Sequence, residues 1–175
     1  MLTGKPEHLT SFDYVGLHRY FLTFCTDSRR HLLTTADVVD LVLSQIVRAA
    51  VDEQVAIVAY CFMPDHLHLL IEARAETSDC LRFIKGAKQY SGYYYAKAFG
   101  SPLWQRYGFE RVLRNDEATL VVARYTLENP LRAGLVTRIE DYPFVGSKTH
   151  SLEEILSAVM DALPHGPAEA GHYVP

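Results

Sequence analysis

The sequence has no long apolar segment, no closely spaced pair of cysteines and no overall excess of positive charge. Its longest apolar run, from Val55 to Pro64, is far shorter than the roughly 20 residues that a membrane-spanning helix requires. The 3 cysteines lie far apart without a CxxC pair, which predicts reduced thiols rather than a disulfide framework or a zinc site. No stretch near the N-terminus has the composition of a signal peptide. We therefore expect a cytoplasmic protein with no membrane segment.

The composition is that of a folded globular protein. Hydrophobic residues make up 49% and charged residues 22% of the 175 positions, which excludes global disorder and suits one compact domain. We expect residues 1–150 to form this single domain. Residues 151–175 are expected to add a C-terminal helix and a flexible tail.

The charge is distributed unevenly along the chain. The formal net charge is -4, and an acidic balance argues against a nucleic-acid-binding protein. However, the segment from Arg82 to Arg138 carries +6, and the remainder of the chain carries -10. This basic segment is either an ordinary solvated surface or a surface that binds phosphates, because lysine and arginine neutralise backbone phosphates.

Apolar periodicity and turn residues predict the secondary structure. Strands are expected at 20–26, 55–62, 66–72 and within 103–114, and helices at 36–50, 80–99, 116–129 and 152–163. The third helix is expected to begin with a cap at Asn115 or Asp116 and to end at Asn129, because Pro130 follows. This order predicts an α+β, ferredoxin-like sandwich whose antiparallel sheet carries helices on one face.

Two histidines open the third expected strand. Side chains alternate along a strand, so His66 and His68 point to one face while Leu67 and Leu69 point to the other face, into the core. Imidazoles about 7 Å apart at this two-residue step can share one metal ion. The pattern is also compatible with surface histidines or with hydrogen-bonded histidines in the core.

A tyrosine and an amide share a face of the third expected helix, since Tyr125 and Asn129 are four residues apart. A tyrosine hydroxyl, with a pKa of about 10, is a poor nucleophile. Beside a divalent cation that polarises a phosphate it can still attack, and Asn129 can add an oxygen ligand. The alternative for Tyr125 is simple packing in the core. The tyrosines at 90 and 93–95 lie among lysines and either stack on unpaired bases or pack inside the protein.

Three blocks of the sequence together resemble one family. Residues 60–70, YCFMPDHLHLL, resemble the histidine–hydrophobe–histidine motif of the HUH single-tyrosine transposases. Residues 103–114 are similar to the middle block of that family, and residues 124–136, RYTLENPLRAGLV, resemble the block that carries the nucleophile. The similarity runs in order over residues 14–148. The REP-associated tyrosine transposases are the most similar branch.

This resemblance implies a specific chemistry. His66, His68 and Asn129 would hold Mg²⁺ or Mn²⁺, and Tyr125 would attack single-stranded DNA that folds as a hairpin, leaving a 5′-phosphotyrosine. Asp65 stands where asparagine is more usual, and it either orients His66 or perturbs the site. The residues expected to contact DNA are Arg82, Lys85, Lys88, Gln89, Arg111, Arg114 and Arg132. The protein would be a monomer or a homodimer.

Two other functions remain open from the sequence. One is a non-catalytic protein that binds single-stranded or hairpin nucleic acid on the same fold. The other is a small metal-dependent hydrolase that uses the two histidines and a bound water. The second alternative lacks an evident third strong ligand near His66 and His68, apart from Asp65.

Overall fold

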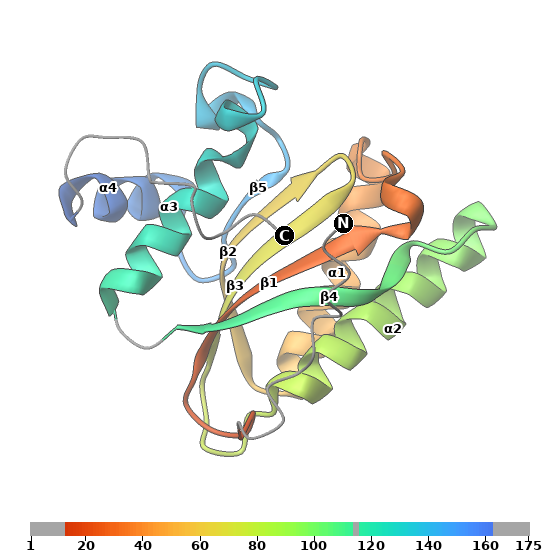
Figure 1. Cartoon of the computed structure of the whole chain (residues 1–175), viewed down its shortest axis with the longest axis horizontal. Helices are drawn as coiled ribbons and strands as arrows, with labels where there is room; N and C mark the ends of the chain where they lie inside the picture. The colour runs from red at the N-terminus through yellow and green to blue at the C-terminus, as the bar shows by residue number, and fades with distance from the viewer. Residues whose placement is uncertain (1–12, 114–115, 163–175) are drawn as a thin grey trace, which may run out of the picture.

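The computed structural model describes residues 13–113 and 116–162. Its elements follow the expected order closely (Figure 1). The strands are β1 (Arg19–Thr26), β2 (Val55–Met63), β3 (His66–Ala73), β4 (Trp104–Leu113) and β5 (Val145–Gly146). The helices are α1 (Ala36–Asp52), α2 (Cys80–Phe99), α3 (Asp116–Arg132) and α4 (Leu152–Ala162), with short 3-10 turns η1 (Asp27–Arg29) and η2 (Ile139–Asp141). The expected tail after residue 163 and the expected cap at Asn115 lie outside the described residues.

The five strands form one antiparallel sheet in the order β4-β1-β3-β2-β5. The first four strands, with α1 between β1 and β2 and α2 between β3 and β4, have the connectivity of a split βαβ fold. β1 and β3 lie side by side in the middle of the sheet, so residues of the two strands stand directly opposite one another. This confirms the predicted α+β class and antiparallel sheet.

Helices cover both faces of this sheet, whereas the sequence predicted them on one face. Tyr20, Leu22 and Phe24 of β1 pack in a core with α1 and α2. Phe21, between them, packs in a second core with α3 and α4 on the opposite face. The physical reason is that the central strands are apolar on both faces, and each face must be shielded from water. The two layers are visible in Figure 1.

The helix α3 runs through Pro130 to Arg132, so the prediction that it ends at Asn129 is wrong. Pro130 removes the backbone hydrogen bond that its own nitrogen would donate and crowds the carbonyl four residues earlier, but only one turn of helix follows it. The turn continues through the amide of Ala133, which donates to the carbonyl of Asn129 at 3.0 Å. Gly134 then adopts a φ of 67°, the left-handed conformation that closes a helix.

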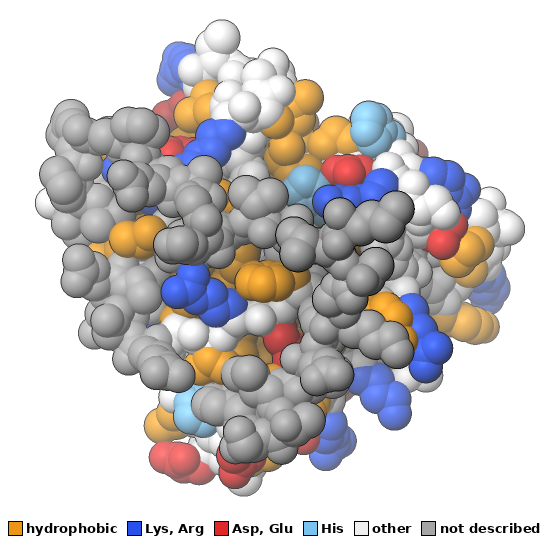
Figure 2. Space-filling view, in the orientation of Figure 1, with side chains coloured by type: hydrophobic (Ala, Val, Ile, Leu, Met, Phe, Trp, Pro, Cys, Tyr) orange, Lys and Arg blue, Asp and Glu red, His pale blue; other side chains and the backbone are white. Residues whose placement is uncertain are grey.

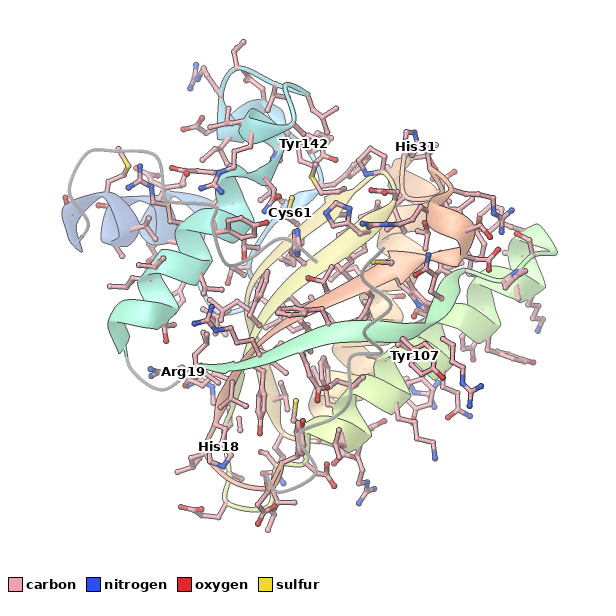
Figure 3. The ribbon with its side chains drawn as sticks, viewed as in Figure 1. His18, Arg19, His31, Cys61, Tyr107 and Tyr142 are labelled. Carbon is pink, nitrogen blue, oxygen red and sulfur yellow. The ribbon has the colours of Figure 1, made fainter. Side chains whose placement is uncertain are left out.

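The three cysteines are free thiols, as expected. Cys61 lies in the core on the α3 side of the sheet, close to Tyr142 (Figure 3). The hydroxyl of Tyr142 donates a hydrogen bond of 2.7 Å to the carbonyl of Phe62, which joins the segment after α3 to β2. No helix within residues 13–113 and 116–162 is long and apolar enough to cross a membrane.

Candidate active site

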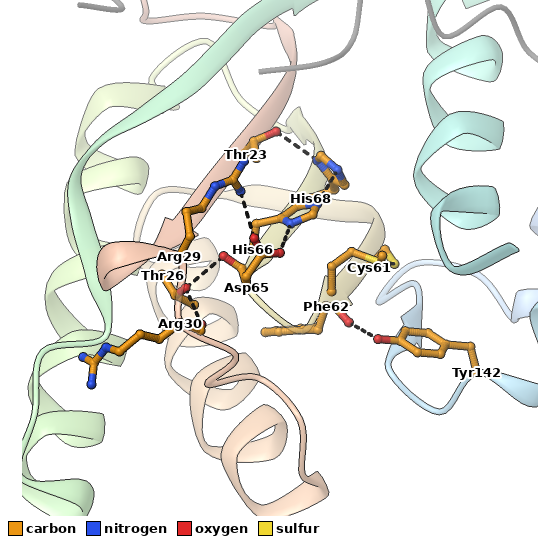
Figure 4. Close-up of polar contacts among 11 residues, drawn as sticks. Thr23, Thr26, Arg29, Arg30, Cys61, Phe62, Asp65, His66, His68 and Tyr142 are labelled. Carbon is orange, nitrogen blue, oxygen red and sulfur yellow. Dashed lines mark hydrogen bonds and ion pairs between the residues drawn. The ribbon is translucent and has the colours of Figure 1, made fainter. Parts of the chain in front are cut away.

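Two imidazoles face each other at the start of β3. The chain turns at Pro64 and Asp65, and β3 begins at His66. The Nε2 atoms of His66 and His68 are 3.1 Å apart, and both rings lie on the α3 side of the sheet (Figure 4). His68 is 1% exposed. Leu67 and Leu69 point into the opposite core, so the predicted alternation of the strand is confirmed.

The outer nitrogen of each imidazole has its own partner. Nδ1 of His66 is 2.6 Å from Oδ1 of Asp65, and Nδ1 of His68 is 2.9 Å from Oγ1 of Thr23 on the neighbouring strand β1 (Figure 4). Because a carboxylate only accepts, Nδ1 of His66 carries the proton and its Nε2 carries a lone pair. The pair is therefore oriented from both sides by groups that do not lie between the rings.

A strained turn brings an arginine to Asp65. Ser28 and Arg29 in η1 both have a φ of 55°, a conformation that costs an ordinary residue about 1–2 kcal/mol. Nη1 of Arg29 lies 3.5 Å from Oδ2 of Asp65. Backbone strain of this kind is typical of positions where the surrounding structure fixes a functional group. Here it completes a chain of contacts from Arg29 through Asp65 to His66.

Burial and neighbouring charges set the protonation of the site. Burial lowers the pKa of His66, and burial together with the nearby His66 and Arg29 lowers that of His68 well below its usual value. Burial acts to raise the pKa of Asp65, but the hydrogen bond from His66 and the charge of Arg29 hold it below its usual range. At neutral pH this favours an ionised Asp65 and two neutral imidazoles, which is the form that binds a cation.

The ring of Tyr125 packs directly against His68. Its centroid is 5.7 Å from that of His68 and 5.9 Å from that of Phe21, and the residue is 6% exposed. The guanidinium carbon of Arg132 lies 4.7 Å from the same ring centroid. Three side chains from β1, β3 and α3 thus hold the tyrosine, so the structure brings Tyr125 and the histidines together as expected.

Asn129 lies one helical turn after Tyr125 and contacts it. Its Nδ2 donates a 2.7 Å hydrogen bond to the carbonyl oxygen of Tyr125. Burial raises the pKa of the Tyr125 hydroxyl, while the charge of Arg132 and a hydrogen bond with the Asn129 side chain oppose that rise. Within the described residues, no three His, Cys, Asp or Glu side chains gather as a metal site. In this part of the chain, a third ligand to the two histidines would therefore have to be a group of another kind, such as an amide oxygen or water.

The residues expected to contact DNA do not form one face. Phe21 of β1 pairs with Arg111 of β4 and lies on the α3 side, so Arg111 shares the face of the histidines. Arg132 also lies there, beside Tyr125. The remaining described members of the set lie on α2, which packs on the opposite face; they are Arg82, Lys85, Lys88 and Gln89. Among the described residues visible in Figure 2, basic side chains likewise form separate groups. Arg114 lies outside the described residues.

Two of the α2 residues already have protein partners. The ammonium group of Lys88 donates to the carbonyl oxygens of Gln105 and Arg106, at 2.6 and 3.2 Å, and burial lowers its pKa. Nε of Arg82 lies 3.1 Å from a carboxylate oxygen of Glu53. Lys88 therefore connects α2 to the edge strand β4, a structural contact that its charge alone does not reveal.

A network of charges on α3 escaped the sequence prediction. Oε1 of Glu128 accepts from Nε of Arg124 at 2.7 Å, and Oε2 accepts from Nη2 of Arg132 at 3.2 Å. The i,i+4 spacing of Arg124 and Glu128 on the predicted helix would have revealed the first pair, whereas the second pair was hidden because the helix was expected to end at Asn129. The face of Thr23 could also have been foreseen, because side chains alternate along a strand and its neighbour Leu22 points into the opposite core. Arg29 carries no such signal, since its position depends on a left-handed turn.

The comparisons with known proteins identify the family of this chain. The family profile described as "Transposase IS200 like" matches residues 14–125, which contain the histidine pair and Tyr125. The chain belongs to the IS200-like transposase family. This confirms the family that the three sequence blocks indicated.

Two relatives of this IS200-like protein are informative. A Haemophilus influenzae protein assigned to the REP-associated tyrosine transposases is 26% identical over 106 residues, which span 50% of this chain and 56% of that protein. The chain thus spans about half the length of this curated relative. The solved structure of a REP-associated tyrosine transposase bound to a REP hairpin superposes with a TM-score of 0.71 at 21% identity. The superposition covers 97% of this chain and 99% of the chain in that structure, and it shows that the two proteins share a fold.

The histidine pair of this IS200-like transposase has the geometry of a chelating site. Bonds of about 2.1 Å meeting at roughly a right angle place two ligand nitrogens about 3 Å apart. The observed separation of 3.1 Å between the two Nε2 atoms matches this value, and it is also the length of a hydrogen bond between the two rings. Asp65 fixes the lone pair of His66 towards the shared point, and the residues present therefore fit a divalent cation.

Proposed function

We propose that this protein is a metal-dependent transposase or endonuclease that cuts and rejoins single-stranded DNA hairpins through a 5′-phosphotyrosine intermediate. The observation that carries the proposal is the contact between Tyr125 and His68, whose Nε2 faces that of His66. A nucleophile and a cation-binding pair are thereby adjacent in a buried site. Burial strengthens the electrostatic interactions that phosphoryl transfer requires.

His66, His68 and Asn129 would hold the cation, Mg²⁺ or Mn²⁺. When bound, the cation supplies positive charge that polarises the phosphate. Asp65 and Thr23 hold the imidazoles at the required angle through their Nδ1 atoms. Imidazole ligands suit Mn²⁺ as well as or better than Mg²⁺, which prefers oxygen.

Tyr125 would supply the nucleophile. Its Oη attacks the phosphorus and the bond from phosphorus to the 3′ oxygen breaks. Oη loses its phenolic proton, and the departing 3′ oxygen takes up one proton, so the step is balanced. The products are a 5′-phosphotyrosine and a free 3′-hydroxyl, which keeps the bond energy available for rejoining. Burial raises the pKa of this hydroxyl, so removal of its proton is a real part of the barrier.

The proposed substrate is hairpin DNA with unpaired bases near the site. A structural relative of the same fold was solved with a REP hairpin. In this chain Arg111 and Arg132 lie on the face of the histidines and can bind phosphates beside Tyr125. This face, rather than α2, is the primary DNA surface of the proposal.

The test is covalent capture of labelled hairpin oligonucleotides, with imperfect palindromes of varied loop sequence, in Mg²⁺, Mn²⁺ or EDTA. Wild-type protein should form an adduct that resists denaturing gel electrophoresis and requires the cation. Tyr125→Phe should abolish the adduct. Tyr90→Phe is the matched control, because Tyr90 is engaged with Arg48 and Asp52 on the other side of the sheet and should react normally. Equal adduct from the Tyr125 variant and wild type would refute the assignment.

A non-catalytic hairpin-binding protein is the second candidate. Tyr93 and Tyr94 of α2 are exposed, at 61% and 38%, and aromatic rings of this kind can stack on unpaired bases. Lys85 and Gln89 are exposed on the same helix. Hairpin binding that persists without His66, His68 and the cation, with no adduct under any condition, would favour this function.

A further inference from the structure

The guanidinium of Arg132 is held in a fixed place beside the proposed nucleophile. Its central carbon lies 4.7 Å from the centroid of the Tyr125 ring, and its Nη2 donates to Glu128 at 3.2 Å. Glu128 also accepts from Arg124, and their side chains are only 17% and 12% exposed. The half-buried carboxylate of Glu128 thus orients the guanidinium of Arg132 over the Tyr125 ring that carries the attacking oxygen.

We propose that Arg132 binds the phosphate that Tyr125 attacks, and that Glu128 is the positioning residue that sets its guanidinium there. The inference rests on the proposed function, because it assigns these residues to the reaction of Tyr125. It separates Arg132 from the other basic residues, which would bind the DNA backbone without contacting the reacting group.

The chemistry of the step favours an arginine at this position. As Oη of Tyr125 bonds to phosphorus and the bond to the 3′ oxygen breaks, negative charge accumulates on the non-bridging oxygens. A guanidinium offers five N–H donors in a planar fork, so a contact between Nη2 and Glu128 does not exhaust its capacity. The planar group can also stack on the tyrosine ring while it donates to a phosphate, which an ammonium cannot do in the same way.

The position of Glu128 explains why the guanidinium of Arg132 stays near the Tyr125 ring. Arg132 is in the last turn of α3, after Pro130, where the helix has lost one backbone hydrogen bond. A long side chain at such an end is otherwise free to adopt many rotamers. The carboxylate of Glu128, one turn earlier, restricts that choice, and Arg124 in turn fixes the carboxylate.

A purely structural role is the competing explanation. Arg132 would then only cover the ring of Tyr125, as Arg48 covers the ring of Tyr90 with its guanidinium carbon 4.4 Å from that centroid. The Arg48 pair on α1 and α2 is therefore a natural control. It has the same chemistry and lies on the opposite side of the sheet from the histidines.

The experiment measures single-turnover adduct formation at saturating hairpin DNA with Mn²⁺, together with the dissociation constant in a Tyr125→Phe background. Arg132→Ala should slow adduct formation about 100-fold, the usual cost of removing one donor to a developing oxyanion. Its dissociation constant should change less than fivefold. Millimolar guanidinium should restore at least tenfold of the lost rate. Arg48→Ala should react within twofold of wild type and show no response to guanidinium.

Glu128→Gln tests the positioning step. It keeps the volume of the side chain and removes its charge, so the rate should fall about tenfold with unchanged DNA affinity. A slow Arg132→Ala variant that guanidinium cannot rescue, or one that fails only through weaker DNA binding, would overturn the assignment while leaving Tyr125 as nucleophile. An absence of adduct with wild-type protein would instead refute the proposed function itself.

Discussion

The Nε2 atoms of His66 and His68 face each other at 3.1 Å at the start of β3. Hydrogen bonding by Asp65 sets a lone pair on His66 towards this point. The same arrangement on His68 depends on Thr23, whose hydroxyl can donate to or accept from Nδ1. A cation between the rings would select the form in which both lone pairs point inward. We therefore expect the partners of the outer nitrogens to set how tightly the pair would bind a metal ion.

The first prediction concerns the carboxylate behind His66. Asp65→Asn keeps the shape of the side chain but removes the charge that holds the proton on Nδ1. Loss of an outer partner of a metal ligand typically costs 10–100-fold in affinity, and we expect a loss of about this size for Mn²⁺. Titration calorimetry or electron paramagnetic resonance of bound Mn²⁺ measures it. Asp37→Asn, in the first turn of α1, is the control. Equal Mn²⁺ affinity in both variants would contradict the role of Asp65.

The second prediction concerns Thr23, which is fully buried beneath His68. Thr23→Val preserves volume and leaves Nδ1 of His68 without its partner, so the free energy of unfolding should fall by about 1–3 kcal/mol. The affinity for Mn²⁺ should fall about tenfold as well. Thr126→Val provides the comparison, because it removes a buried hydrogen bond to the carbonyl of Val122 on α3. That variant should lose stability and keep its Mn²⁺ affinity.

Much of this site was predictable from local rules. Alternation along a strand sets His66 and His68 on one face, and helical spacing puts Asn129 one turn from Tyr125. Both rules depend only on backbone geometry, which the apolar pattern reveals. What local rules cannot supply is the pairing of β1 with β3, which brings Thr23 to His68 from 45 residues away in the sequence.

Two features of the structure were not foreseen from the sequence, for identifiable physical reasons. The basic segment was contiguous in sequence, but α2 and α3 pack on opposite faces of the sheet, so Lys85 and Arg132 are separated. Arg29 reaches Asp65 only because two successive residues adopt a left-handed backbone. Such conformations are set by surrounding contacts rather than by the propensity of serine or arginine.

The third prediction concerns the close approach of β4 to β1. A Cβ on Gly108 would lie 2.9 Å from the carbonyl oxygen of Thr23, so Gly108→Ala must displace backbone next to the site. We expect a loss of about 2 kcal/mol in the free energy of unfolding, within the range for overpacked positions. Gly146→Ala meets the Tyr60 hydroxyl at 2.8 Å, the far end of a side chain that can move, and should cost less. Urea denaturation of both variants compares them, and a larger loss for Gly146→Ala would contradict the argument.

The last prediction links the cation to folding stability. A ligand that binds only the folded state stabilises it by about 2.7 kcal/mol at 100 times its dissociation constant. Mn²⁺ at that excess should therefore raise the unfolding free energy of the wild-type protein by about this amount. His66→Gln is the informative variant, because His66 lies at the edge of the site whereas His68 is buried, so folding should survive the change. This variant should lose most of the stabilisation by Mn²⁺. His18→Gln, at the opposite end of the β1–β3 pair, should retain it. Equal stabilisation of the two variants would show that Mn²⁺ binds elsewhere, since of His66 and His18 it is His66 whose Nε2 faces that of His68.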